Sequence, residues 1–305
     1  MNTAVLYLAT VLIWGSTWYA ITLQLGVVDP VVSVAYRFAI AAVILMAWCA
    51  GRGKPMRYGM RDHMWMAGQG MFLFCANYAV FYIATGYVTS GLVSVVFSTI
   101  AAWNIVFGLI FFGTPVSARA SIGAVLGIFG LSLIFLPEVK ALDLHDEAAL
   151  GLALCVIATI LASFGNMASA RNQKNGLPVL QTNAFGMAYG AAFTAIFSAA
   201  TGRDFIWDTS FDYLWSMLYL AMFGSVLAFG AYLTLLGRIG AGRAAYAAVL
   251  FPVVALSLSV VLEDYTFTPL ALVGAALVLG GNILVLAKAR HFSWLKRKKG
   301  AATLS

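Results

Sequence analysis

Aromatic and amide side chains recur at one-turn spacing inside several long apolar stretches of this sequence. Asn77, Tyr78 and Tyr82 share one stretch, and Ser163 and Asn166 share another. Residues three or four apart lie on one face of a helix, so each group predicts a polar stripe. Such stripes suit a cavity for an uncharged or zwitterionic molecule with an apolar or aromatic part. Interhelical hydrogen bonds and interfacial aromatic belts are the alternative interpretation.

The candidate binding residues are aromatic and polar side chains from six of these stretches: Trp18, Asn77, Tyr78, Tyr82, Trp103, Ser163, Asn166, Tyr232 and Tyr246. Tyr78 and Tyr82 lie four residues apart, so their rings could hold an aromatic side chain on one side of a helix. Asn77 and Asn166 could hydrogen-bond the charged ends of a zwitterion.

The sequence lacks the motifs that signal catalysis or ATP-driven work. It has no GxxxxGK[ST] phosphate loop, no HExxH pair and no Cys/His cluster with metal-ligand spacing. Its three cysteines, Cys49, Cys75 and Cys155, are far apart within apolar stretches, which predicts small buried hydrophobic residues. We therefore expect no enzyme activity, no cofactor and no metal site.

Arg37 is the one charged residue well inside an apolar stretch, about seven residues from Pro30. Such an arginine either contacts an anion or a carboxylate, or it extends outward and ties helix ends together. The sequence favours the second interpretation, because the outer interface is within reach of this position. No Asp or Glu lies well inside a stretch, which argues against a proton-coupled antiporter of cations.

The elements that position these side chains must be membrane helices. The chain has 305 residues, of which 62% are hydrophobic and 10% charged, whereas a soluble domain has about 25% charged residues. Ten apolar stretches are long enough to span a bilayer. They lie near 4–23, 31–50, 63–84, 90–112, 118–136, 148–171, 179–200, 212–236, 243–262 and 268–288. The sequence therefore predicts an all-α integral membrane protein with ten transmembrane helices.

Basic residues concentrate in alternate loops between the ten stretches. Fifteen of the 18 Lys and Arg residues fall on one side, including those of the C-terminal tail, and ten of the 11 Asp and Glu residues fall on the other. The side rich in Lys and Arg is normally cytoplasmic. We therefore expect a multi-pass protein of a bacterial-type inner membrane with both termini in the cytoplasm.

The two halves of the chain resemble each other. A shift of 151 residues superimposes five pairs of small residues: Gly86 on Gly237, Gly91 on Gly242, Gly123 on Gly274, Ala124 on Ala275 and Gly130 on Gly281. Each half has five stretches, so the second half must insert upside down relative to the first, as in many secondary transporters. The expected units are two inverted five-helix repeats, 1–140 and 141–290, and a basic cytoplasmic tail, 291–305.

The fifth and tenth stretches carry glycines rather than polar stripes. Gly123, Gly127 and Gly130 share one face, and Gly274 and Gly281 occupy equivalent positions. Small residues at this spacing let helix backbones approach closely, so both stretches are expected to be packing elements rather than cavity walls. The ninth stretch contains Pro252, which removes a helix hydrogen bond and is expected to bend it.

Short motifs along the whole chain resemble the EamA-type branch of the drug/metabolite transporter superfamily. They are Trp14-Gly15-Ser16, Arg37-Phe38, and the region from Phe251-Pro252-Val253 through Glu263 to Gly274 and Gly281. The first half departs from the pattern, with Ala101 in place of the proline and Phe112 in place of Glu263. The resemblance implies alternating access around a central cavity walled by the first, third, fourth, sixth, eighth and ninth stretches.

Within this superfamily the chain most resembles bacterial exporters of aromatic amino acids and other metabolites. The resemblance therefore implies a secondary transporter that exports amino acids, with aromatic and hydrophobic ones favoured, and related small metabolites. A broad-specificity drug or metabolite exporter, including one for cationic toxicants, is the alternative. The expected partners are a small-molecule substrate and the lipid bilayer. The net charge of +7 forms no aromatic-interleaved patch for nucleic acid, and a monomer is compatible with this plan.

Overall fold

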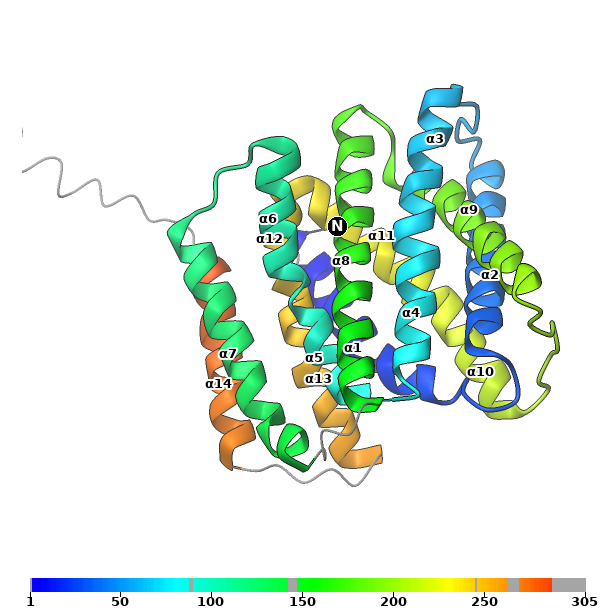
Figure 1. Cartoon of the computed structure of the whole chain (residues 1–305). Helices are drawn as coiled ribbons and strands as arrows, with labels where there is room; N and C mark the ends of the chain where they lie inside the picture. The colour runs from blue at the N-terminus through cyan, green and yellow to red at the C-terminus, as the bar shows by residue number, and fades with distance from the viewer. Residues whose placement is uncertain (1, 88–89, 142–146, 245, 263–268, 287–305) are drawn as a thin grey trace, which may run out of the picture.

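The computed structural model describes residues 2–87, 90–141, 147–244, 246–262 and 269–286 (Figure 1). Across these residues all regular secondary structure is helical, which confirms the all-α prediction. Each of the ten predicted stretches contains at least one helix, and helix ends lie within a few residues of the predicted ends. Apolar runs become helices because a helix pairs every interior backbone N–H and C=O group within the segment.

Helices of the first half follow the order of the predicted stretches. The first two stretches are single helices, the third contains a π-helical segment, and the fourth is divided in two. The elements are α1 (Thr3–Thr22), α2 (Pro30–Gly51), α3 (Met60–Gln69), η1 (Gly70–Ala76), α4 (Asn77–Ala84), α5 (Ser90–Ser98), α6 (Ile100–Phe112) and α7 (Ala118–Ala141).

The second half has a similar series of helices, with its own π-helical segment in the eighth stretch. The elements are α8 (Glu147–Lys174), α9 (Val179–Ala200), α10 (Phe211–Tyr219), η2 (Leu220–Leu227), α11 (Ala228–Ile239), α12 (Ala241–Ala244), α13 (Tyr246–Leu262) and α14 (Pro269–Leu286). The helix α13 continues through Pro252, whereas the equivalent stretch without a proline is interrupted at Thr99. The two halves therefore differ at this point. The helix is interrupted in the first half, which has no proline here, and is continuous in the second half, which has Pro252.

Five helical stretches among the described residues are long and apolar enough to cross a bilayer. They are Thr3–Thr22, Pro30–Gly51, Met60–Ala84, Ala153–Lys174 and Phe211–Ile239. The helix α1 shows how such a stretch serves two environments. Leu8 and Leu12 are more than half exposed, while Trp14 and Trp18 are buried. One face of the helix thus suits lipid and the other packs within the bundle.

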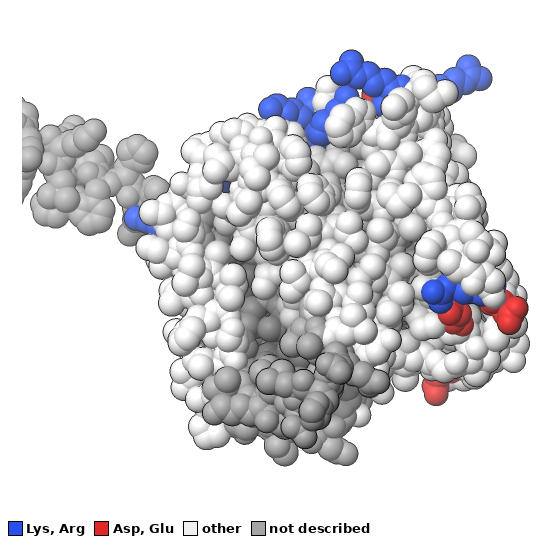
Figure 2. All heavy atoms as spheres, in the orientation of Figure 1, with Lys and Arg blue, Asp and Glu red and all other residues white. Residues whose placement is uncertain are grey.

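Charged side chains gather at the two ends of the bundle. Figure 2 shows most of the visible Lys and Arg side chains at the end where α3 begins and α8 ends. Most of the visible Asp and Glu side chains lie near the opposite end, and the face between is almost free of charge. This separation agrees with the loop assignment made from the sequence, since a bilayer occupies the uncharged band.

Backbone contact joins α7 to α14 at one edge of the molecule (Figure 1). A Cβ atom on Gly281 would lie 2.7 Å from the carbonyl oxygen of Gly123 and 3.2 Å from the nitrogen of Gly127. Only glycine permits this approach, because a Cβ atom does not come so close to backbone atoms. The prediction that the glycines of the fifth and tenth stretches form a packing face is confirmed at these positions.

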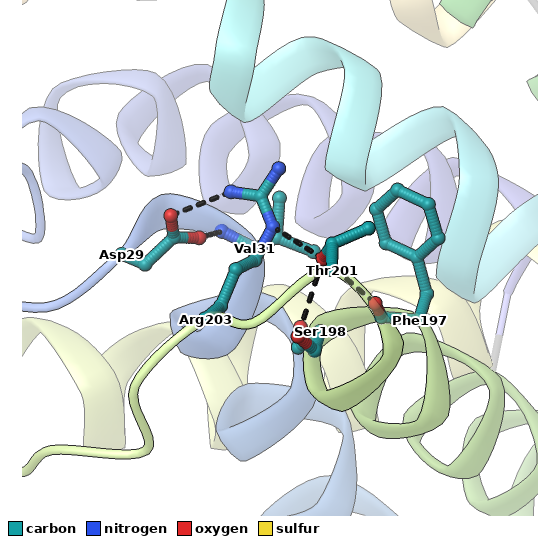
Figure 3. Close-up of polar contacts among 6 residues, drawn as sticks. All are labelled: Asp29, Val31, Phe197, Ser198, Thr201 and Arg203. Atoms are coloured by element: carbon teal, nitrogen blue, oxygen red, sulfur yellow. Dashed lines mark hydrogen bonds and ion pairs between the residues drawn. The ribbon is translucent and has the colours of Figure 1, made fainter.

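An ion pair joins the start of α2 to the loop after α9 (Figure 3). Asp29 caps α2, since its Oδ1 accepts from the backbone nitrogen of Val31 at 2.8 Å. Its Oδ2 accepts from Arg203 Nη1 at 2.5 Å. Arg203 Nε in turn donates to Thr201 Oγ1 at 3.1 Å. The Asp29 carboxylate therefore caps the start of α2 and links it to the loop after α9. The helices α2 and α9 also pack against each other.

Candidate functional site

A narrow cavity, here called the first cavity, lies in the interior of the bundle and has a volume of about 30 Å³. Its walls come from the six stretches that the resemblance implies, together with Arg37 from α2. The lining side chains are mainly aromatic and apolar. They are Trp14, Thr17, Trp18, Ile21, Arg37, Leu73, Asn77, Tyr78, Phe81, Phe97, Ile100, Ala162, Asn166, Phe229, Tyr232 and Phe251.

Two tryptophans of α1 organise the aromatic wall. Trp14 and Trp18 lie four residues apart, so both project from one face of the helix. Each contacts rings from other elements, mainly in tilted or edge-on geometries, which aromatic quadrupoles favour. The centroid distances are 4.7 Å for Trp14–Phe229, 4.9 Å for Trp14–Tyr232, 5.3 Å for Trp14–Phe251, 5.8 Å for Trp18–Phe81 and 5.7 Å for Trp18–Phe97.

Four buried polar side chains from α6, α8 and α11 form a hydrogen-bonded group, here called the Asn104 cluster. Ser163 Oγ donates to Asn104 Oδ1 at 2.6 Å. Asn166 Nδ2 donates to the same oxygen at 3.3 Å and to the Tyr232 hydroxyl at 3.0 Å. Asn104 Nδ2 also donates to the Tyr232 hydroxyl, at 3.4 Å. The cluster ties three helices together through neutral groups alone.

A second cavity, about 590 Å³ in volume, has Asn104 of this cluster in its lining. Its lining includes Lys174 at the end of α8 and Arg243 of α12, so it is on the side with the basic loops. Asn104 lines this second cavity, whereas Asn166 and Tyr232 line the first. The cluster therefore contributes side chains to both cavities.

Arg37 is buried, with an exposed fraction of 1%, so the expectation that it extends outward to the interface was wrong. Its Nε donates to Ser225 Oγ at 2.9 Å, and its Nη1 donates to the Tyr82 hydroxyl at 3.4 Å. Its guanidinium carbon also lies 4.8 Å from the Tyr78 ring centroid. The physical reason for the error is tertiary: acceptors and rings from η2 and α4 surround the side chain and hold it inside.

Three buried polar atoms that have no hydrogen-bond partner belong to residues that line the first cavity. They are Trp18 Nε1, Asn77 Oδ1 and Asn166 Oδ1, all buried. Only five buried side-chain atoms of the described residues are in this condition, so three of them share one cavity. An unpaired buried polar group costs about 1–3 kcal/mol. Unpaired buried polar groups are rare in native proteins, and a bound water or ion is one way in which they are satisfied.

The structure brings five of the nine candidate residues to the first cavity: Trp18, Asn77, Tyr78, Asn166 and Tyr232. Asn77 and Asn166 come from different halves of the chain, and both line one space as the zwitterion hypothesis requires. This common location makes the five residues candidates for contact with one ligand.

The other four candidates lie elsewhere. Tyr82 is 1% exposed and accepts from Arg37 while donating to Gln24 Oε1 at 3.1 Å, so it supports the cavity rather than lining it. Ser163 belongs to the Asn104 cluster. Trp103 stacks on Phe107, with ring centroids 5.8 Å apart. The side chain of Tyr246 is outside the described residues.

Several residues that line the first cavity were not among the candidates predicted from the sequence. The internal repeat could have predicted some of them. The shift of 151 residues relates three pairs that all line the first cavity: Tyr78 with Phe229, Phe81 with Tyr232 and Ile100 with Phe251. Arg37 and Phe97 carry no such signal. Apolar aromatic residues like Phe97 are common in every stretch, so their type alone does not distinguish a wall from a lipid-facing surface.

The three cysteines are buried within the helices. Cys49 and Cys155 are fully buried, Cys75 is 7% exposed, and all three are free thiols. This confirms their expected role as small buried hydrophobic residues. Within the part of the chain that the structure describes, no group of three or more His, Cys, Asp or Glu side chains could hold a metal ion.

Comparisons with known proteins agree with the fold and the apolar helices. The sequence profile of the EamA-like transporter family matches residues 1–136 and 149–287. A probable amino-acid metabolite efflux pump of Escherichia coli (strain K12) is 25% identical over 292 residues, covering 91% of this chain and 92% of that protein. The uncharacterized inner membrane transporter YedA of the same organism is 26% identical over 279 residues, covering 91% and 88%.

A solved crystal structure shares the fold, with a TM-score of 0.76 at 18% identity, covering 97% of this chain and 98% of the other. The family match extends over most of the chain and falls in two segments that correspond to its two halves. With five membrane-spanning candidates among the described residues, the chain belongs to the EamA-like transporter family and is a multi-pass membrane transporter rather than an enzyme.

Proposed function

We propose that this protein is a secondary transporter that exports amino acids, with aromatic and hydrophobic ones favoured, and related small metabolites across the inner membrane. The observation that carries the proposal is the composition of the first cavity. Its aromatic walls match an apolar side chain, and its unpaired indole and amide groups match the charged ends of an amino acid. The name of the Escherichia coli efflux pump supports the same substrate class.

Ten transmembrane helices in two inverted repeats, 1–140 and 141–290, are the architecture that we infer for this transporter. The contacts between helices support it. When each helix is replaced by its equivalent in the other half, a contact between two helices becomes another contact that is also present. The helix α1 packs on α13 while α8 packs on α6, and α1 packs on α11 while α8 packs on α4. The pairs α2–α9 and α7–α14 map onto themselves. This pattern is what a pseudo-twofold axis in the membrane plane produces.

The two π-helical segments give independent support for the repeat. The segment η1 spans Gly70–Ala76, and the shift of 151 residues moves these positions to 221–227, within η2. The segment η1 packs on α9, and η2 packs on α2. Because π-helical segments are rare and frequent at functional sites, their equivalent positions favour duplication of a functional element over coincidence.

Alternating access accounts for the sizes of the two cavities. The first cavity, at about 30 Å³, has room for water but not for an amino acid, so loading requires its walls to separate. The Asn104 cluster contributes side chains to this cavity and to the second cavity, which has a volume of about 590 Å³. We infer that breaking the hydrogen bonds of this cluster joins the two cavities and admits substrate from the basic side.

The basic end of the molecule is assigned to the cytoplasm. Lys and Arg residues of the loops gather there (Figure 2), and Lys174 and Arg243 line the second cavity. Cytoplasmic loops of membrane proteins carry such an excess of basic residues. On this assignment the second cavity is the cytoplasmic vestibule, and both termini are cytoplasmic.

An exporter of cationic toxicants fits the first cavity less well. Arg37 is a permanent positive charge in its wall, and among the described lining residues there is no Asp or Glu to attract a cation. A cationic substrate would therefore meet repulsion in a site where low dielectric strengthens electrostatic interactions.

Counterflow in proteoliposomes tests the proposed function. Vesicles that contain the purified protein are loaded with an unlabelled amino acid, and uptake of the same labelled amino acid from outside is followed. Phenylalanine, leucine and other apolar amino acids are expected to exchange, whereas lysine and a lipophilic cation such as tetraphenylphosphonium are expected not to. Exchange of tetraphenylphosphonium without exchange of any amino acid would replace the proposal with the drug-exporter alternative.

A further inference from the structure

Arg37 brings a positive charge into the wall of the first cavity without a matching negative charge. Its side chain is buried and lines the cavity. Among the described residues, no Asp or Glu side chain makes an ion pair with it. A charged side chain inside a membrane is costly, and such residues are usually paired or functional. The buried charge of Arg37 therefore has no negatively charged partner among the described residues.

The neighbours of Arg37 fix its guanidinium group through neutral side chains alone. Nε donates to Ser225 Oγ at 2.9 Å, and Nη1 donates to the Tyr82 hydroxyl at 3.4 Å. These neutral partners use two of the five N–H groups that a guanidinium carries. The aromatic face of Tyr78 supports the group from the side, 4.8 Å from its central carbon. These contacts hold the arginine in place, and none of them supplies a negative charge.

We propose that Arg37 binds the carboxylate of the transported molecule and makes a carboxylate a requirement for binding. The inference rests on the proposed function, since it takes an amino acid or a similar metabolite as the substrate. A guanidinium binds a carboxylate through strong charge-assisted hydrogen bonds, often two in parallel. The carboxylate of the substrate supplies the negative charge that the described lining of the first cavity lacks.

Acceptors for the other pole of a zwitterion lie on the same cavity. Asn77 and Asn166 line the cavity, and the Oδ1 atom of each is buried and has no hydrogen-bond partner. An ammonium group offers three donors and no acceptor, so it satisfies such oxygens. The cavity therefore combines donors for a carboxylate with acceptors for an ammonium, and an α-amino acid is the simplest molecule that uses both.

Binding to the purified full-length protein in nanodiscs tests the inference without requiring transport. Three ligands of similar shape are compared by thermal shift: L-phenylalanine, 3-phenylpropanoate, which lacks the amine, and L-phenylalaninamide, which lacks the carboxylate. The wild type is expected to bind the first two about tenfold or more tighter than the amide, because hydrogen bonds between charged groups are the strong ones. Equal binding of all three ligands would overturn the inference.

Arg37→Gln is expected to weaken both carboxylate ligands about tenfold or more and to leave the amide unchanged. Arg37→Lys keeps the charge but loses the planar fork, so it is expected to keep part of the preference. Arg57→Gln, in an exposed loop, is the matched control and is expected to behave as wild type. Unchanged carboxylate preference in folded Arg37→Gln would contradict the inference.

A glycine pair tests the position of Arg37 without removing its charge. A Cβ atom on Gly224 would lie 3.0 Å from Arg37 Nη2 and 2.9 Å from Thr17 Cγ2, whereas one on Gly230 would meet nothing within 4 Å. Gly224→Ala is therefore expected to displace the guanidinium and weaken carboxylate ligands severalfold, and Gly230→Ala is expected to leave them unchanged. Equal effects of the two variants would count against this geometry.

The outcomes separate the inference from the function on which it rests. If the wild type exchanges no amino acid but binds 3-phenylpropanoate through Arg37, the proposed function fails and the carboxylate site stands. If amino acids exchange and Arg37→Gln exchanges them with unchanged affinity, the inference fails and the function stands. Loss of 3-phenylpropanoate binding on replacing methanesulfonate with chloride in the buffer would assign Arg37 to an inorganic anion and overturn the inference.

Discussion

The guanidinium carbon of Arg37 lies 4.8 Å from the centroid of the Tyr78 ring, in the interior of the helix bundle. Both side chains line the first cavity, and they come from α2 and α4. A cation over an aromatic face gains about 1–2 kcal/mol where water is excluded. This contact offsets part of the cost of burying the charge, and it fixes the ring and the arginine as one unit.

The effect of replacing Tyr78 on the rate of amino acid exchange should therefore depend on whether the aromatic ring is kept. Tyr78→Leu is expected to slow amino acid exchange about fivefold, which corresponds to roughly 1 kcal/mol from the lost cation–π contact. Tyr78→Phe keeps the ring and is expected to stay within about twofold of the wild type. Counterflow rates in proteoliposomes measure both variants. A slower Tyr78→Phe than Tyr78→Leu would mean that the hydroxyl, not the ring, matters.

Asn166→Ala should impair transport and leave the fold intact. The variant removes a buried, unpaired acceptor and two hydrogen bonds of the Asn104 cluster. We expect substrate affinity to fall about threefold to tenfold, equivalent to about 0.5–1.5 kcal/mol. Asn175→Ala, at an exposed position after α8, is the matched control. Normal affinity in Asn166→Ala, with a monodisperse elution profile, would remove this residue from the site.

Adjacent glycines of α14 should respond differently to the same substitution. A Cβ atom on Gly281 would meet the backbone of α7, whereas one on Gly280 would meet nothing within 4 Å. Gly281→Ala is expected to lower the stability of the folded protein by about 1–3 kcal/mol through overpacking. Gly280→Ala is expected to be neutral or slightly stabilising. Thermal unfolding in detergent compares them, and equal melting temperatures would contradict the backbone contact.

The orientation of the chain can be tested with single cysteines. Substitutions at Lys54 and Asp208 lie in loops at opposite ends, and the three native cysteines are buried, so background labelling should be low. An impermeant maleimide added to intact cells is expected to label Asp208→Cys and not Lys54→Cys. Labelling at Lys54→Cys alone would invert the proposed topology.

Exchange should not require a proton gradient. The described residues that line the first cavity include no Asp or Glu, and membrane proton relays commonly depend on such groups. We expect the rate of amino acid exchange in proteoliposomes to be the same with and without an imposed gradient of one pH unit. Obligatory proton countertransport, seen as a pH change that accompanies substrate flux, would show that coupling uses groups outside this cavity.

The sequence by itself determined the elements and the class of the protein. Long apolar runs predicted each helical stretch, because apolar residues and internally paired backbones are both required in a bilayer. Glycine spacing predicted the packing face that joins Gly281 to Gly123. These features are local, so the order of residues along the chain is sufficient to reveal them.

The π-helical segments were not predictable in the same way. Gly70–Ala76 and Leu220–Leu227 are at least as apolar as the α-helical residues before and after them. A change from the α-helical to the π-helical hydrogen-bond pattern alters which carbonyl each N–H contacts, not the type of side chain. Composition and periodicity therefore do not predict a π-helical segment. In the folded chain η1 packs against α9, and η2 packs against α2.

Only the tertiary structure decided which polar side chains share a site. Position along α2 left two directions open for Arg37, outward to the interface or inward to a cavity. Ser225 and Tyr82, 188 and 45 residues away in sequence, provide the acceptors that hold it inside. Asn104, absent from the candidates, joins Asn166 and Tyr232 in the same manner. A buried polar group takes the direction in which it finds partners, and those partners come from other helices.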